Sequence, residues 1–255
     1  MNVLGLVAAA AAGGIAAAIN SAAGGGSFVS FPTLVFLGVP PITANATNTT
    51  AMWIGQAGSI HGFRDNLLRP TPRFIAAMAT SVIGGILGAV ILLHTPQHAF
   101  DRIIPWLLLF ATTMFAISPW VRRLANHTGG VEDVSWWSTV PLFIVAVYGG
   151  FFGGGQGIVL LAYFALIGMT NLPKMNALKS VLAFINNGVP VIPFVVARAI
   201  AWDVASAMCI GAIAGGYYGA RLTRNLPPQV MRGAVVVLGF IASAAFFWRA
   251  VAGSH

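Results

Sequence analysis

The sequence predicts an all-α polytopic membrane protein made of two inverted-topology repeats, each with about five helical elements. Three observations lead to this prediction: long apolar segments almost free of charge, two glycine-rich breaks at matching places, and a one-sided distribution of positive residues. We expect a first transmembrane repeat over residues 1–120, a cytoplasmic linker over 121–135, and an inverted second repeat over 136–255.

Charge is scarce along the chain. Of its 255 residues, 58% are hydrophobic and 7% are charged, whereas soluble domains carry about 25% charged residues. Uncharged windows long enough to match the ~30 Å hydrocarbon layer lie at 3–22, 45–60, 74–93, 103–119 and 204–220. A membrane-spanning barrel would instead alternate apolar and polar residues in strands of about ten residues. We attribute the net charge of +8 to cytoplasmic loops, so the expected partner is the lipid bilayer and not nucleic acid.

The two halves of the chain repeat each other. "GGGSF" at Gly24 and "GGGQG" at Gly153 are 129 residues apart. "NATNTTA" from Asn45 and "NALKSVLA" from Asn176 are 131 residues apart, and the same spacing separates "GGILGA" from "GGYYGA". Small residues are common wherever membrane helices touch. Here, however, the matching motifs follow the same order at nearly constant spacing over about 75 residues in both halves, which indicates a true internal repeat.

Each repeat reads as five apolar elements. In the first they lie at about 3–22, 26–38, 45–61, 74–93 and 103–119; in the second, at about 136–152, 155–168, 175–197, 204–221 and 231–249. The second element of each repeat would extend only about 20 Å at 1.5 Å per residue, too short to cross a bilayer. We therefore predict half-helices, each paired across its glycine break with the element before it.

The positive residues test this arrangement. If each glycine-linked pair returns the chain to the side from which it entered, ten Lys and Arg share one side, and only Arg102, Arg198 and Arg249 lie on the other. If each pair instead forms one broken crossing helix, the division is seven to six. The positive-inside rule favours the first arrangement. It places both termini in the periplasm of a bacterial inner membrane and gives the halves opposite orientations, as in many secondary transporters.

The glycine breaks are candidate binding sites. Glycine runs unwind a helix at low cost, and unwound backbone at membrane depth must face protein or water. A new helix begins after each break, at Ser27, which suits an N-cap, and at Gln156; helix starts attract anions. The alternative is that these glycines only allow close helix packing. The candidate substrate-binding residues here are Gly25, Gly26, Ser27, Gly154, Gly155 and Gln156.

The next element of each repeat adds polar groups on one helical face. These candidates are Asn45, Asn48 and Thr49, with their repeat partners Asn176, Lys179 and Ser180. A lysine inside an apolar element is costly and usually functional, but Lys179 also lies close enough to the loop to extend its ammonium to the cytoplasmic surface. Both interpretations stay open at this point. Asn186 and Asn187 are further polar candidates.

Missing residue types narrow the function. The five acids all fall in loops or at the ends of apolar elements, whereas cation transporters and most proton relays need a carboxylate within the span. No nucleophile–histidine–acid set, phosphate loop or histidine motif typical of a metal site is present. We therefore expect a small anionic substrate, no metal, no cofactor and no enzymatic activity.

Two stretches resemble a known family. "AAGGGSFVSFPTLVFLGVPPITANATNTTAMWIGQAG" and "GGFFGGGQGIVLLAYFALIG", followed by "NALKSVLAFINN", resemble the sulfite exporter TauE/SafE transporters over nearly the whole chain. The resemblance implies export of sulfite or organosulfonates such as sulfoacetate. We expect transport by alternating access. The alternatives are a passive anion channel or a carrier of another small organic anion on the same scaffold, and a membrane-embedded enzyme is disfavoured because a catalytic set is missing.

The predicted topology can be tested by cysteine labelling. In a Cys209→Ala background, Thr128→Cys places the only thiol in the 121–135 linker. Because this linker is expected in the cytoplasm, a membrane-impermeant maleimide should label it only after the cells are opened. Labelling in intact cells would contradict the inverted arrangement.

Overall fold

The computed structural model describes residues 1–22, 25–62, 71–125, 136–169, 171–223 and 228–252. Over these residues every regular element is a helix, which confirms the predicted all-α class. The helices are α1 (Val3–Ala22), α2 (Ser27–Phe36), α3 (Pro41–Gly62), α4 (Pro72–His94), α5 (Gln97–Ala125), α6 (Thr139–Phe151), α7 (Gln156–Leu166), α8 (Leu172–Gly188), α9 (Val191–Val196), α10 (Trp202–Thr223) and α11 (Pro228–Ala252), with a short 3-10 turn, η2 (Trp136–Ser138), before α6.

The outside of the bundle is apolar. Large side chains such as Leu4, Ile210 and Trp248 are 77%, 70% and 78% exposed, where a helix of a soluble protein would carry polar residues. Among the described residues, five helical segments are long and apolar enough to cross a bilayer: Val3–Asn20, Pro72–His94, Gln97–Ile117, Lys174–Val196 and Gly233–Ala250. The chain is therefore a multi-pass membrane protein, as predicted.

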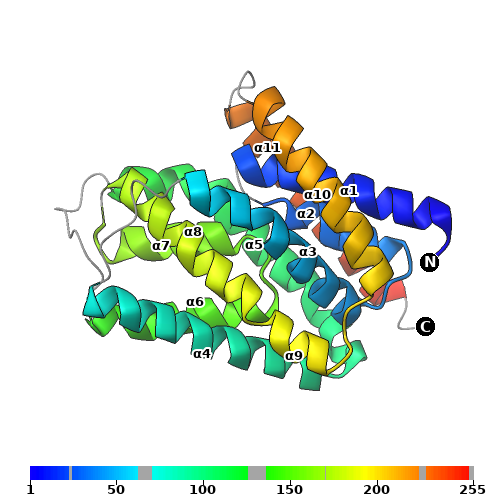
Figure 1. Cartoon of the computed structure of the whole chain (residues 1–255), viewed down its shortest axis with the longest axis horizontal. Helices are drawn as coiled ribbons and strands as arrows, with labels where there is room; N and C mark the ends of the chain where they lie inside the picture. Colours follow the sequence, from blue (N-terminus) through cyan, green and yellow to red (C-terminus); the bar gives the residue numbers. More distant parts are fainter. Residues whose placement is uncertain (23–24, 63–70, 126–135, 170, 224–227, 253–255) are drawn as a thin grey trace.

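Exposed tryptophans gather near the ends of the helices. They are Trp202 and Trp248 in α10 and α11, and Trp120 and Trp137 on the two sides of the linker, whereas exposed Trp106 lies further inside α5. Trp106 contacts Phe247 with 5.0 Å between ring centroids, and the Met1 ammonium donates to Asp203 at 3.1 Å. These contacts bring the starts of α1 and α10 and the end of α11 to the end of the molecule where both chain termini lie (Figure 1). Tryptophan is enriched at membrane–water interfaces.

Two helix pairs pack at backbone distance through glycine. A side chain at Gly215 of α10 would overlap the carbonyl of Gly14 in α1, and one at Gly150 of α6 would overlap the carbonyl of Gly85 in α4. Small residues allow this approach, which drives helix association in lipid. The close packing that was the alternative for the glycine runs occurs at these helical glycines, and also at Gly26 of the first run, where a side chain would overlap the Ala16 carbonyl of α1.

The helix pairs occur in matched sets. The contacts of α1 with α10, α2 with α3, and α3 with α10 have counterparts in those of α6 with α4, α7 with α8, and α8 with α4. Likewise, α1 contacts α2 as α6 contacts α7, and α5 contacts α7 as α11 contacts α2. In this correspondence α1, α2, α3, α4 and α5 of the first half match α6, α7, α8, α10 and α11 of the second, in that order. Replacing each helix by its match converts each of the contacts named above into its counterpart.

Three short helices end in the same way. The chain enters the left-handed region at Gly38 after α2, Gly168 after α7 and Arg198 after α9, with φ of 88°, 87° and 54°. At each, two backbone bonds return to the last helical turn, as in the Schellman motif that glycine normally supplies. A non-glycine residue in this conformation costs roughly 1–2 kcal/mol, so Arg198 is a strained exception.

One predicted element is divided. We expected a single helix over 175–197, but the structure has α8 and α9 with a break at Val189 and Pro190. Pro190 and Pro193 lack the N–H groups that would continue the ladder, and Ile192 instead bonds the Val189 carbonyl at 3.2 Å. The prediction was wrong because two prolines inside an apolar run were read as a continuous span.

Neighbouring glycines provide a test of the α1–α10 contact. Gly215→Val should lower the free energy of unfolding by roughly 1–3 kcal/mol because the side chain overpacks the seam. Gly216→Val is the matched control, since a Cβ there meets nothing within 4 Å. Thermal unfolding of the purified variants in detergent measures the difference; equal losses would show that the seam does not hold the bundle together.

Candidate functional site

The first glycine break lies between α1 and α2. Gly25 has a left-handed φ of 87°, and Gly26 is the N-cap of α2. The expectation that Ser27 caps this helix is wrong, because Ser27 is already its first helical residue and the N-cap, Gly26, has no side chain to accept a capping bond. Instead, Asn20 from α1 crosses the break, and its Oδ1 accepts the Gly26 N–H at 2.7 Å.

The second break lies between α6 and α7. Gly153 and Gly155 both take left-handed φ values, 71° and 69°. The Tyr148 hydroxyl donates to the Gly154 carbonyl at 2.6 Å and so satisfies the unwound backbone. Gln156 begins α7 and is 3% exposed. The positive φ values show that glycine is needed here for unwinding, and not only for close packing.

Most backbone donors in the first turns of the half-helices are already used. Phe28 N bonds the Gly25 carbonyl at 3.0 Å, Gln156 N bonds that of Gly153 at 3.3 Å, and Ile158 N bonds that of Gly155 at 2.9 Å. Among the described residues, the amides of Ser27 and Gly157 have no such bond. The donor set at each helix start is therefore narrower than the sequence suggested.

The predicted polar face of α3 is buried and extends to both breaks. Asn45, Asn48 and Thr49 are all at most 6% exposed. Asn48 Oδ1 accepts the Ser30 hydroxyl of α2 at 2.5 Å, whereas Asn45 Nδ2 donates to the Phe151 carbonyl, at the end of α6, at 2.9 Å. The α3 helix of the first half thus helps to hold the unwound backbone of the second.

The corresponding face of α8 lies beside the start of α7. Lys179 Nζ donates to Asn176 Oδ1 at 3.1 Å, and the Ser180 hydroxyl donates to the Asn176 carbonyl at 2.9 Å. A Cβ at Gly157 would lie 3.5 Å from Lys179 Cδ, so the lysine stem runs along the first turn of α7. All three side chains are half-buried.

Asn186 and Asn187 of α8 lie beside the second glycine break, which the sequence did not indicate. A Cβ at Gly153 would lie 3.5 Å from Asn187 Oδ1 and 3.9 Å from Thr49 Oγ1. A side chain at Gly149 would overlap the amides of both Asn186 and Gln156. Two adjacent asparagines in an apolar span are themselves a sequence signal for a binding-site residue.

Three buried amide oxygens near this break have no hydrogen-bond partner among the described residues: Asn45 Oδ1, Gln156 Oε1 and Asn186 Oδ1. Asn45 and Asn186 each donate their NH₂ group to a backbone carbonyl, the latter to Ala146 at 3.0 Å. These bonds fix which end of each amide is oxygen. The cluster therefore offers acceptors as well as donors, which suits water or a protonated oxygen of a ligand.

The repeat distributes its amides unequally. Gly149 in α6 aligns with Asn20 in α1, and Asn186 in α8 aligns with Gly55 in α3. Each half thus carries one asparagine and one glycine at this pair of positions, in reversed order. The first break is held by an amide from the helix before it, and the second contacts an amide from α8.

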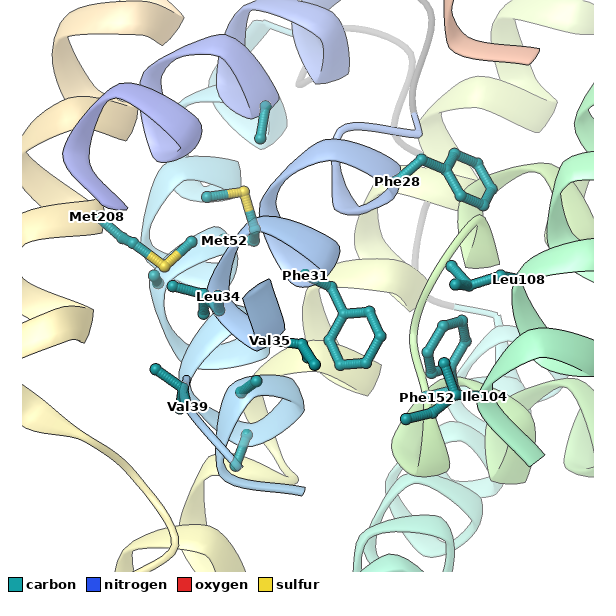
Figure 2. Packing of buried hydrophobic residues seen from close by; sticks show 14 of the residues in the cluster. Phe28, Phe31, Leu34, Val35, Val39, Met52, Ile104, Leu108, Phe152 and Met208 are labelled. Carbon is teal, nitrogen blue, oxygen red and sulfur yellow. The ribbon is translucent and has the colours of Figure 1, made fainter. Parts of the chain in front are cut away.

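Apolar rings fill the space between the two breaks. A Cβ at Gly25 would lie 3.1 Å from Phe28, and one at Gly155 would lie 3.3 Å from the same ring. Phe31 and Phe152 meet with 5.4 Å between ring centroids, and Figure 2 shows these rings beside Leu108 and Ile104 of α5. We call Phe28, Phe31 and Phe152 the aromatic cluster.

The described carboxylates stay away from this site. Asp101 and Asp203 are both exposed, in the second turn of α5 and the first turn of α10. The described residues contain no group of three or more His, Cys, Asp or Glu that could hold a metal ion. The site is built from amides, hydroxyls, helix starts and one lysine.

Comparison with known proteins assigns this arrangement to a family. The family model of the sulfite exporter TauE/SafE proteins matches residues 9–246, from α1 to α11 and across both glycine breaks. The chain belongs to the TauE/SafE family. This result confirms the resemblance found in the sequence, and it makes this TauE/SafE protein a membrane transporter.

Two relatives share most of their length with this TauE/SafE protein. A probable membrane transporter protein of Haemophilus influenzae is 28% identical over 224 residues, which cover 85% of this chain and 84% of the relative. A probable membrane transporter protein, ORF9, of a Sinorhizobium species is 25% identical over 214 residues, covering 82% and 80%. No solved structure matches the chain.

The role of Lys179 can be measured directly. If its ammonium contacts the substrate, Lys179→Gln should weaken binding by roughly ten- to a hundredfold, because a charge-assisted hydrogen bond contributes on the order of 1.5–3 kcal/mol. Isothermal titration of purified protein with sulfoacetate gives the affinity. Lys174→Gln, in the first turn of the same helix, is the matched control and should leave affinity unchanged. Equal affinity in both variants would show that Lys179 extends to the membrane surface instead.

Proposed function

We propose that this TauE/SafE protein exports small sulfur-containing anions, sulfite or organosulfonates such as sulfoacetate, by alternating access. The observation that carries the proposal is the pair of glycine breaks, each followed by a half-helix start among buried amides. Family membership and the names of the two relatives support transport. The anionic substrate class follows from the chemistry of the site.

The site recognises an oxyanion through dipoles more than through full charges. The starts of α2 and α7 each carry a partial positive charge, and the amides of Ser27 and Gly157 are the donors available there. Lys179 adds a full positive charge beside α7. The acceptor oxygens of Asn45, Gln156 and Asn186 would receive hydrogen bonds from hydration water or from a protonated oxyanion.

Alternating access needs two halves that can exchange roles. The matched helix contacts support an inverted repeat, with α1–α5 related to α6–α11. In the described arrangement the aromatic cluster lies between the two breaks, so we infer that it must part for a substrate to pass. The charge distribution of the sequence supports a topology with the termini in the periplasm and the linker in the cytoplasm of a bacterial inner membrane.

The first alternative is a passive anion channel on the same scaffold, and the second is a carrier of another small organic anion. A carrier exchanges substrate in a saturable manner and shows counterflow, whereas a channel supports steady current. The buried aromatic cluster favours the carrier, because no channel can conduct through close-packed phenylalanine rings while they stay in place.

Counterflow in proteoliposomes tests the proposal. Vesicles loaded with unlabelled sulfite should take up labelled sulfite, with sulfoacetate competing and lactate not competing. Gln156→Ala should reduce the initial rate by about tenfold or more, since a lost hydrogen bond to an anion corresponds to on the order of 1.5–3 kcal/mol.

The matched control is Gln97→Ala, another glutamine at the first position of a helix, α5, but distant in sequence from both breaks. It should transport at the wild-type rate. Steady current without counterflow would favour the channel, competition by lactate alone would favour the other carrier, and a normal rate for Gln156→Ala would remove Gln156 from the site.

A further inference from the structure

A groove opens on the bilayer side of the bundle where α8 gives way to α9. It has a volume of about 570 Å³ and is lined mainly by Trp53, Phe184, Gly188, Ile192, Val195 and Val196. The volume lies within the range of about 300–1,000 Å³ found for small-molecule sites. The groove lies where Pro190 and Pro193 interrupt the hydrogen-bond ladder between α8 and α9.

The groove occupies one side of the membrane-spanning segment. Its lining begins at Phe184 and ends at Val196, the second half of the candidate span Lys174–Val196. Trp53 contacts Phe184 in a tilted arrangement, with 5.5 Å between ring centroids, near the middle of the span. Ile192 and Val196 are 65% and 79% exposed, so the groove faces lipid and runs from about mid-depth to one surface.

Arg198 lies at the surface end of this groove, two residues after Val196. It is exposed, and no ion pair with a carboxylate of the described residues involves it. Its φ of 54° is the strained value at a position where α2 and α7 both end in glycine. Glycine at the corresponding positions after α2 and α7 avoids this strain. A strained arginine at the third position indicates that the charged side chain has a function there.

We propose that the groove binds an acyl chain of an anionic phospholipid whose phosphate is held by Arg198. The guanidinium forms paired hydrogen bonds with phosphate, and exposed Trp202 nearby in the chain places this end at the headgroup level. The apolar lining receives the chain as the bilayer interior would. A helix from a second copy could fill the groove, but its apolar surface would give Arg198 no anion.

Native mass spectrometry can count the bound lipid. Protein purified in detergent with added palmitoyl-oleoyl phosphatidylglycerol should retain one lipid, and Arg198→Gly should reduce retention at least tenfold. The same variant removes the backbone strain, so its lipid-free melting temperature should rise by about 2 °C. Arg198→Lys keeps the charge and should retain most of the lipid, whereas Arg102→Gly, at another exposed arginine, should leave retention unchanged.

A second pair of variants tests the groove itself. Ile192→Trp fills it and should displace the lipid, whereas Val237→Trp adds the same ring to an exposed position of α11 outside it and should not. Dioleoylglycerol, which lacks the phosphate, should not be retained by the wild type. The proposal fails if Arg198→Gly holds phosphatidylglycerol normally, if dioleoylglycerol binds as well, or if light scattering shows that Ile192→Trp dissolves a dimer while lipid retention persists.

Discussion

Unwound backbone inside a bilayer must find its hydrogen bonds within the protein, and the rest of this structure depends on that requirement. Each glycine break exposes peptide groups that no helix can satisfy. Asn20 accepts from Gly26, Tyr148 donates to Gly154, and Asn45 donates to the carbonyl at the end of α6. The polar residues of α1, α3 and α6 are thus needed to build the breaks, before they are considered for binding anything.

The polar residues that hold the unwound backbone are also the candidate binding residues. The candidate site therefore combines polar atoms that already have hydrogen-bond partners with atoms that have none among the described residues. An amide has donors at one end and an acceptor at the other. Where the donor end of Asn45 or Asn186 is fixed to a carbonyl, the oxygen faces away from that bond and has no partner among the described residues. Burying such an oxygen costs free energy, and a hydrated ligand would recover it. Structural bonds therefore set which atoms are available to a substrate.

Much of this fold could be predicted from the sequence because membrane segments obey few rules. Charge-free windows located the long helices, and the glycine runs located the starts of α2 and α7 to the residue. The α8–α9 break was missed because hydropathy averages over Pro190 and Pro193. The cap of α2 was misassigned because Asn20, six residues before Gly26, satisfies the backbone from across the break, a contact that local capping rules do not consider.

The site was harder to predict than the fold. Helical spacing identified Asn45, Asn48 and Thr49 as one face, and all three are buried. It did not rank Asn186 above Ser180, because the packing of Asn186 against Gly149 depends on how α6 and α8 approach each other. Nor did it predict the aromatic cluster, since Phe28 and Phe152 look in sequence like any lipid-facing or core residue.

The exposed positions of Asp101 and Asp203, away from the candidate site, have an electrical consequence under the proposed function. If the substrate is the anion proposed above and no proton accompanies it, its charge crosses uncompensated and each turnover moves current. A cell interior held negative then contributes about 2.3 kcal/mol per 100 mV to the outward movement of a monovalent anion. On this scaffold the resting potential of the membrane would by itself drive export, with the direction of flow set by the sign of the cargo.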